Sequence, residues 1–535
     1  SQPLSQEWVE RCPFFALVPF IQTRRAQPPG GLPLVRDYER EWQQFQTYRQ
    51  AREALRRTTE VEVGAESEAA HVMADLQPAH DFWIVTHVGD RKMQALKAHN
   101  ELVKRWWEIR DRLADHLRVI LSMTAKPGLD PDAVAKDWAH AIGRGTKVEL
   151  TASQLFNPHQ GKGQNRPKAN ALVMGNLKSF WLLEYLKAAG LWQCAVPRTV
   201  RDGNDRKTYV LAPMNISLAS HRKIFKDFSE RLWNQTAVKM DCIAALLYTQ
   251  TLLEYSEAGQ YDELNFEGRG PEDIVAGFRV AQYKLLSRNA YTMMNMAFLG
   301  LPTWTGEVKT QEEVLALKEV IEEHLEIIQQ RELDENRSDC YALLVNYRDF
   351  LSSGRWDRFF DFTIAYSQYV MGQLERGNRF VRHFTARLLG RLVMNTNKPL
   401  APIIDNQGFQ NLAYAIRHST VIPQGRKARG EDTLYEVRYG LGMELRRKAH
   451  YAKDFIAALS AFMHTYNAEN AQVLERRKQQ MRRGLSTSDI KDIVHLVDEY
   501  GSETVCNLLV AFGYAREPRE EVTGEPSVES TAKEP

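Results

Sequence analysis

The sequence predicts a mainly α-helical, multidomain protein with a smaller mixed α/β region and a C-terminal helical bundle. Three observations predict it. Apolar residues recur at spacings of three and four along most of the chain, which is the helical repeat. Strand-like segments occur only in the middle, and proline and glycine interrupt the helical pattern near residue 400. The 535 residues, 43% of them hydrophobic, are enough for roughly two to four domains.

The clearest helical repeats lie in three stretches. Their apolar residues share one helix face, and Asp and Glu tend toward the start of each stretch, where the helix dipole favours negative charge. We expect helices over residues 37–60, 91–123 and 310–353.

The strand signals surround an unusual loop. Residues 146–153 and 207–217 are short and rich in β-branched side chains, and the turn at 201–205 has the character of a hairpin. Between the two strands lies the loop 157–170, and an amphipathic helix is expected directly after it, from Ala171. The mixed α/β region is therefore expected around residues 146–240.

The segment "PLAPIIDNQG" at 399–408 marks a domain boundary, so we expect a large body over 1–400. Ser486 followed by Asp489 indicates a helix start. The chain then becomes acidic and rich in Pro, Ser, Thr and Gly, so residues 517–535 are expected to be disordered. Residues 401–516 are expected to form a bundle of four helical segments, at about 409–420, 433–449, 452–482 and 486–514, the last broken at Gly501.

Composition favours a soluble, cytoplasmic protein. No window contains the roughly 18 consecutive apolar residues of a membrane span, and the N-terminal residues lack the apolar core of a signal peptide. The five cysteines are far apart and form no CxxC pair, which argues against a zinc ribbon or a disulfide framework and suits a reducing compartment.

The sequence carries no recognisable catalytic motif. It lacks a phosphate-binding P-loop, a GxSxG elbow, an HExxH pair and an EF-hand loop. The pair His80-Asp81 stands without further metal ligands and is expected at the surface, and His324 is expected on an exposed helix face. We therefore expect a protein that is not an enzyme and that needs no metal or other cofactor.

The loop at 157–170 reads "NPHQGKGQNRPKAN" and has the composition of a nucleic-acid contact. It contains no carboxylate to repel phosphates, and its glycines allow close backbone approach to a strand. Its cations can neutralise phosphates and its amides can hydrogen-bond base edges; these side chains are Lys162, Arg166 and Lys168, and Gln160, Gln164, Asn165 and Asn170. The alternative is a solvated connector, in which Gly, Asn and Lys are also common.

A second nucleic-acid signal lies near the C-terminal end. Residues 417–483 hold fourteen Lys and Arg against seven Asp and Glu, a local charge of 14 − 7 = +7 within a chain whose net charge is +2. Cations at helix ends are favoured by the dipole alone, so solvation is the alternative. The candidate phosphate contacts are Arg426, Lys427 and Arg429, expected in a loop; Arg446, Arg447 and Lys448, expected late in a helix; and Arg476, Arg477, Lys478, Arg482 and Arg483, expected late in the next.

Aromatic residues also alternate with bases in "KRWWEIR" at 104–110. Such a pattern can stack on single-stranded nucleic acid. At helical spacing, however, core packing is the stronger interpretation, so Trp106 and Trp107 are expected to lie in the interior.

The loop and the C-terminal helices together resemble the large subunit of a type I CRISPR surveillance complex (Cascade). The loop resembles a family pattern "NPxQGKGxNRxKA". The C-terminal stretch is similar to the helical small-subunit module of this family; it contains "RYGLGMELRRKA", "DFIAALSAFMHTYNAENAQ" and "DIKDIVHLVDEYGSETVCNLLVAFGYARE". The similarity covers roughly half of the chain.

The resemblance implies a non-catalytic antiviral-defence subunit within a ribonucleoprotein complex. Such subunits read a short protospacer-adjacent motif in duplex DNA and help to open the duplex into an R-loop, while guide RNA supplies the long sequence specificity. The implied partners are guide RNA, double-stranded target DNA, the displaced single strand, and the backbone-filament, foot and separate small subunits. A helicase-nuclease or a transposition factor is a further implied partner; no membrane is.

Within this resemblance, the amides of the loop 157–170 would read base edges and its cations would bind phosphates. Some family loops also insert a bulky wedge, for which only Pro167 is available here. The chain lacks the HD cluster and the GGDD motif of related polymerase-like large subunits. Two other interpretations stay open: a helical scaffold that contacts acidic protein without reading a motif, and a nuclease with a scattered active site.

Overall fold

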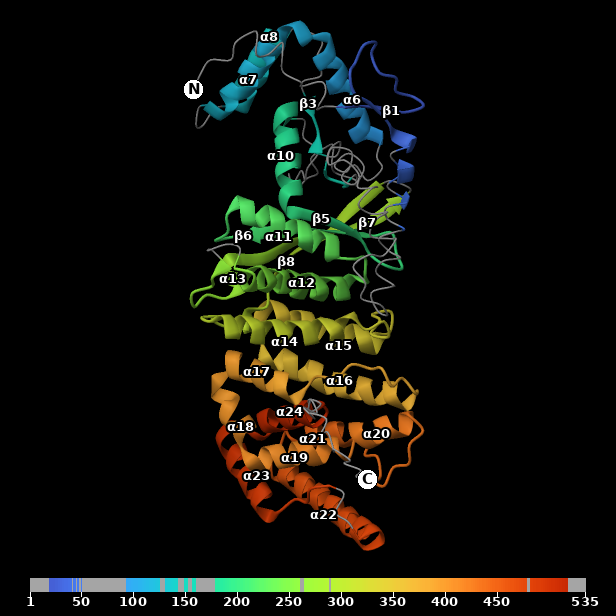
Figure 1. Ribbon diagram of the computed structural model, residues 1–535, viewed down its shortest axis with the longest axis vertical. Helices are drawn as coiled ribbons and strands as arrows, with labels where there is room; N and C mark the ends of the chain where they lie inside the picture. Colours follow the sequence, from blue (N-terminus) through green and yellow to red (C-terminus); the bar gives the residue numbers. More distant parts are fainter. Residues whose placement is uncertain are drawn as a thin grey trace, which may run out of the picture. The chain divides into compact units, whose positions relative to one another are not determined.

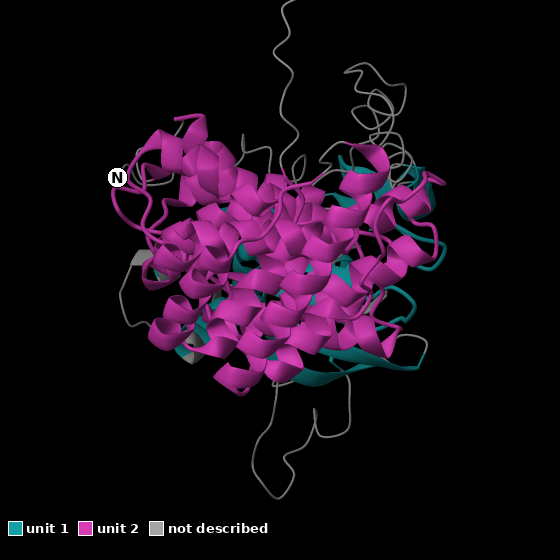
Figure 2. Cartoon of the chain, turned by 90° about the horizontal axis from the view of Figure 1, so that it is seen from below, with its two compact units in different colours: residues 1–210, 279–297 teal, residues 211–278, 298–535 magenta. Residues whose placement is uncertain are grey.

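The computed structural model confirms a mainly α-helical chain with a smaller β part (Figure 1). Contacts divide the chain into two compact units, residues 1–210 with 279–297 and residues 211–278 with 298–535 (Figure 2). The structure describes residues 19–40, 42–44, 46–47, 50, 93–125, 130–142, 149–152, 156–159, 179–259, 264–287, 290–478 and 482–517. The pair at 80–81 and the tail from 518 lie outside the described residues.

The first unit contains helices and short strand pairs. The stretch 91–123, expected as one helix, is divided by a 3-10 turn, and the described part of 37–60 is helical from Tyr38. The elements are β1 (Phe20–Gln22), β2 (Val35–Asp37), α6 (Met93–Glu108), η2 (Arg110–Arg112), α7 (Leu113–Ala125), α8 (Pro131–Ile142), β3 (Glu149–Leu150), β4 (Ser179–Phe180) and α10 (Trp181–Cys194).

Three tryptophans build the core of this unit. Trp138 and Trp181 are buried with their rings 5.0 Å apart, and Trp106 packs edge-on against Trp181 at 5.7 Å. Trp107 packs against a neighbouring cluster that includes Phe20. Trp106 and Trp107 are half-buried and pack against the core clusters, so the predicted core packing is confirmed but neither ring is fully enclosed.

Part of the helix expected from Ala171 is present as α10, which begins at Trp181. Residues 179–180 were expected to be helical but pair with β3 as the strand β4, and residues 171–178 lie outside the described part of the chain. The antiparallel pairing joins segments that are distant in sequence, a contact that no local pattern shows.

A four-stranded sheet has the order β5 (Ala195–Thr199), β6 (Arg206–Pro213), β7 (Val275–Ser287), β8 (Ala290–Gly300). The hairpin predicted at 201–205 joins β5 to β6, and β6 is the strand expected at 207–217. The long strands β7 and β8 were not predicted. Gly277 has φ +141°, and an added Cβ would lie 2.2 Å from the Leu299 carbonyl oxygen, so only glycine fits there.

The second unit stacks helices in successive layers, in which α12 contacts α14 and α15, α15 contacts α16, and α16 contacts α24 (Figure 1). The stretch 310–353 forms two helices, not one. The helices are α11 (Leu218–Arg231), α12 (Ala237–Glu257), α13 (Pro271–Ile274), η4 (Thr303–Thr305), α14 (Gln311–Gln329), α15 (Ser338–Ser353), α16 (Trp356–Glu375), α17 (Ala386–Thr396), η5 (Lys398–Leu400), α18 (Ala401–Asp405), α19 (Gln407–Arg417), α20 (Val421–Ala428), α21 (Leu441–Lys448), α22 (Ala452–Arg477), α23 (Thr487–Tyr500) and α24 (Ser502–Gly513).

His324 lies in the core of these layers, so the prediction of an exposed helix face is wrong. Its side chain is buried, and its Nδ1 lies 2.6 Å from the Tyr347 hydroxyl. Burial lowers the pKa of His324 to about 3, so the ring is neutral. The reason lies in the helical repeat, since Val320 and Ile328 precede and follow the histidine by four positions and are both buried.

The C-terminal helices agree with the prediction in several places. Ser486 and Asp489 form a capping box at the start of α23, and Gly501, with φ +81°, separates α23 from α24. The helix α20 was not predicted, because Pro423 and Gly425 read as breakers. The contact division has no boundary near residue 400; an independent fold for 401–516 stays a prediction.

Two features of composition can be followed in the described part of the chain. No helix there combines the length and the apolar character needed to cross a bilayer. The four described cysteines, Cys194, Cys242, Cys340 and Cys506, form no disulfide bond.

Candidate nucleic-acid interface

The start of the loop 157–170 is held by the sheet. His159 forms a parallel bridge with Tyr291 of β8, and the Met293 backbone N–H donates to His159 Nδ1 at 3.0 Å. Asn157 turns the chain just before it by accepting the His159 N–H through its side chain. The loop therefore departs from the edge strand β8. Its predicted contact residues, Gln160, Lys162, Gln164, Asn165, Arg166, Lys168 and Asn170, lie outside the described residues.

The first basic cluster lies on a helix, so the prediction of a loop for Arg426, Lys427 and Arg429 is wrong. Arg426 and Lys427 occupy the last turn of α20, and Arg429 is its C-cap. Pro423 is tolerated because first-turn N–H groups need no helical partner. All three cations are exposed, and Arg429 pairs with Glu431 at 2.6 Å.

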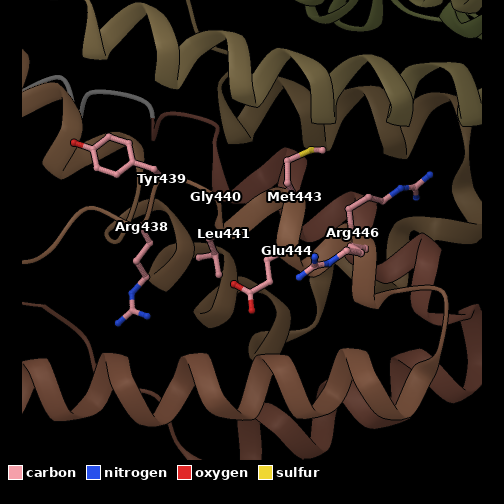
Figure 3. Close-up of a pocket in the computed structure, with 8 residues that line it drawn as sticks. Arg438, Tyr439, Gly440, Leu441, Met443, Glu444 and Arg446 are labelled. Atoms are coloured by element: carbon pink, nitrogen blue, oxygen red, sulfur yellow. The ribbon is translucent and has the colours of Figure 1, made fainter.

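The second cluster lies beside a groove that runs along α21, which we call the α21 groove (Figure 3). Arg446, Arg447 and Lys448 are in the last turn of α21, as predicted. The groove has a volume of about 750 Å³, and Tyr439 and Met443 are exposed in it. Its lining consists of Arg438, Tyr439, Gly440, Leu441, Met443, Glu444, Arg446 and Arg447.

The first two clusters meet at this groove through Tyr439. Lys427 donates to the Tyr439 hydroxyl at 3.2 Å, and its ammonium lies 5.8 Å from the centre of the same ring. A cation from the end of α20 is thus joined to a lining residue that precedes α21. The groove therefore combines an exposed aromatic ring with cations from two segments of the chain.

The arginines that line the α21 groove differ in how firmly they are held. Arg438 pairs with Glu469 of α22 at 2.6 Å, and Arg446 donates to Asn507 and lies 3.6 Å from Asp361. Figure 3 shows Arg438 and Arg446 on opposite sides of the labelled lining residues. Arg447 is exposed and makes no ion pair with the residues that the structure describes. It is therefore the lining cation most available to an anionic partner.

The third cluster divides into two parts. Arg476, Arg477 and Lys478 are exposed at the end of α22, where Lys478 caps the helix in the left-handed conformation with φ +55°. Among the described residues, no contact joins these three side chains to the α21 groove. They form a separate cationic surface.

Arg482 belongs to the interior, and its prediction as a phosphate contact is wrong. Its side chain is only 1% exposed and pairs with Glu469 at 2.8 Å. The guanidinium lies between two aromatic rings, 3.6 Å from the centre of Tyr435 and 3.9 Å from that of Tyr466. It also donates to the His418 carbonyl oxygen at 3.1 Å. The Arg482 guanidinium therefore links several parts of the bundle and is not accessible to a ligand in solvent.

Arg483, the next residue, is exposed as predicted. It donates to Asn411 at 2.9 Å and lies 5.1 Å from the centre of the Tyr414 ring. Tyr414 in turn stacks on His418 at 4.0 Å. Burial, together with the positive charges of nearby arginines such as Arg426 and Arg483, lowers the pKa of His418 to about 4. The surface around His418 is therefore electropositive.

Sequence reasoning missed the apolar part of the interface. Tyr439 and Met443 lie between the basic runs that were singled out, and an aromatic residue inside a basic stretch was the available signal. Among the described residues, no group of three or more His, Cys, Asp or Glu is arranged to hold a metal ion. No protein-family model, curated protein or solved structure matches the chain.

Proposed function

We propose that the chain is a non-catalytic, nucleic-acid-binding subunit of an RNA-guided DNA-targeting complex, as its resemblance to Cascade large subunits implies. One observation carries the nucleic-acid part of the proposal. Tyr439 and Arg447 line one groove, and Lys427, from a separate basic cluster, binds the Tyr439 hydroxyl. Cations next to an aromatic ring match the alternating phosphates and bases of a nucleic acid.

The residues of the α21 groove would divide the work. Arg447, which has no ion pair among the described residues, would bind phosphate, and Lys427 would add a second cation beside the ring of Tyr439. Arg446 is already held by Asn507 and Asp361, so it would act mainly as a fixed positive charge. Each phosphate contact releases counterions, and binding would therefore weaken as salt increases.

The loop 157–170 would read the motif beside the target. Its attachment through His159 to the edge strand β8 supports this role, because a loop fixed at one end searches less space before it meets DNA. The amides of Gln160, Gln164, Asn165 and Asn170 would contact base edges in the minor groove. Lys162, Arg166 and Lys168 would contact phosphates.

The experiment that tests the motif-reading role uses the reconstituted guide-RNA complex and duplexes with a randomised flanking motif. The wild type is compared with a Lys162→Ala/Asn165→Ala/Arg166→Ala variant at one salt concentration. We expect the wild type to select a short motif and the variant to lose that selection. Unchanged selection with lower salt-dependent affinity would reduce the loop to an electrostatic clamp, and no change in either would make it a connector.

A helical scaffold that binds an acidic protein is the second candidate. The observation in its favour is that Tyr439 and Met443 leave apolar surface exposed between the groove cations, as interface centres commonly do. Retention of DNA by an Arg447→Glu variant, together with loss of a protein partner, would favour the scaffold. Loss of DNA binding in that variant would favour nucleic acid.

A further inference from the structure

The last described segment of the chain contacts the buried face of α21 and the start of α17. The backbone N–H of Gly442, a buried residue of α21, donates to the Tyr514 hydroxyl at 3.1 Å. Arg446 on the groove donates to Asn507 of α24. Three residues after Tyr514, Glu517 forms an ion pair with Arg417. The chain therefore leaves the described structure beside the start of α17, where Arg516 pairs with Phe384 and Ala386, and its first acidic residue is already paired with an arginine of α19.

The residues that follow are complementary in charge to the groove. Residues 518–535 contain five glutamates against Arg519 and Lys533, a net charge of 2 − 5 = −3. The α21 groove is lined by three arginines and Glu444, a net charge of 3 − 1 = +2. Glu520 and Glu521 lie only three and four residues beyond Glu517, a reach of roughly 10–14 Å in extended chain.

We propose that the acidic segment 518–535 docks in the α21 groove of its own chain and competes there with other polyanions. The docking itself stands on the groove and the segment alone. The competition with nucleic acid rests on the proposed function. Docking of this kind would bring glutamates of the segment to Arg447 and would cover the exposed Tyr439 and Met443.

The strength of such a contact follows from its setting. Exposed ion pairs are weak because water and salt screen them, so the segment binds weakly as a separate peptide. Attached to Glu517, however, it is present at a local concentration on the order of millimolar. A weak contact is then occupied much of the time and is still displaced by a partner that makes several phosphate contacts at once. The docked segment therefore excludes polyanions that bind the groove weakly and is displaced by those that bind it strongly.

The docking is tested in the full-length chain by zero-length carbodiimide crosslinking, with the joined peptides mapped by mass spectrometry. Lys427 and Lys448 are the lysines at and beside the groove. We expect crosslinks from glutamates of 518–535 to these two lysines, and we expect Arg447→Glu to reduce them at least threefold. Lys491→Glu, a charge reversal of an exposed residue on α23, is the matched control and leaves them in place. Crosslinks spread evenly over exposed lysines such as Lys453 and Lys491, or unaffected by Arg447→Glu, overturn the docking.

The competition is tested with a Glu520→Gln/Glu521→Gln variant of the full-length chain, which keeps the length of the segment. We expect this variant to bind a labelled DNA about threefold to tenfold more tightly than the wild type at low salt, and to gain nothing in an Arg447→Glu background. Equal affinity of the variant and the wild type overturns the competition. If no chain binds DNA while the groove crosslinks are present, the proposed function fails and the docking stands. If DNA binds and the groove crosslinks are absent, the docking fails and the proposed function stands.

Discussion

Arg482 and Arg447 belong to the same basic stretch of sequence, yet their surroundings in the second unit are opposite in character. Arg482 is enclosed between Tyr435 and Tyr466 and is paired with Glu469, whereas Arg447 is exposed at the α21 groove. The difference is made by neighbours that are distant in sequence. A run of bases therefore indicates positive charge, but only the packing of aromatic rings and acids decides which of those charges can meet a ligand.

The largest effect is expected at the buried member of the pair. Arg482→Met removes one partner of a buried ion pair and leaves Glu469 and the His418 carbonyl oxygen without this donor. Loss of a partner costs about 3–5 kcal/mol of unfolding free energy when the remaining buried charge is uncompensated, and because Glu469 keeps its pair with Arg438, we expect a loss below that range. The measurement is chemical denaturation of the full chain. Arg483→Met, one residue away and exposed, is the control and should change stability by less than about 0.5 kcal/mol.

The exposed member should show the reverse behaviour. Arg447→Glu is expected to leave the unfolding free energy within about 0.5 kcal/mol of wild type, since its side chain is exposed and has no ion pair among the described residues. Its affinity for DNA should fall, and the slope of log affinity against log salt should decrease by about 1. Binding isotherms at four or more salt concentrations measure both. A stability loss as large as that of Arg482→Met would contradict the distinction between the two regions.

A smaller, pH-dependent effect on stability is expected at Glu323, a partly buried carboxyl of α14. Burial raises the pKa of Glu323 to about 7, although its carboxylate accepts the Thr385 N–H at 2.8 Å. The pKa of Glu323 is higher in the folded state than in the unfolded state. The contribution of this carboxyl to the free energy of unfolding is therefore largest below about pH 4.5, and it is lost as pH rises through 7. Glu323→Gln keeps an acceptor for Thr385 and removes this loss.

The variant should therefore melt at a temperature similar to wild type at pH 5 and at a higher one at pH 8, by roughly 2–4 °C for each kcal/mol recovered. The gain is at most about 3 kcal/mol and smaller where solvent reaches the carboxyl. Thermal melts at the two pH values are sufficient to measure it. A gain that is equal at both would mean that ionisation of Glu323 is not its cause.

Much of the helical framework could be predicted from local sequence. The capping box of Ser486 and Asp489, the break at Gly501 and the hairpin at 201–205 each depend on residues within five positions of one another. The misses follow the same logic. The position of α20 was hidden by Pro423, which a first turn tolerates, and His324 was judged by its polarity although its helical repeat placed it among buried neighbours.

The candidate site was predictable only in part. The cations at the ends of α21 and α22 were identified correctly, because the helix dipole and the repeat place them. The α21 groove was not, since it needs Lys427 beside Tyr439 and needs Arg446 held by Asp361 and Asn507. Those partners are 12 to 85 residues apart, and their proximity arises only from the packing of α16, α21 and α24. The motif-reading loop stays a prediction.

The position of α24 has a consequence for the order in which the protein is assembled. Every residue from Val505 to Gly513 is buried, and the helix contacts α16, α19, α21 and α23. These partners are all synthesised earlier, so during translation they emerge with an apolar surface that nothing yet covers. The layer closes only when α24 leaves the ribosome, and until then the nascent chain exposes apolar surface of the kind that promotes aggregation. The last helix to be synthesised in this bundle thus completes the burial of the helices that precede it.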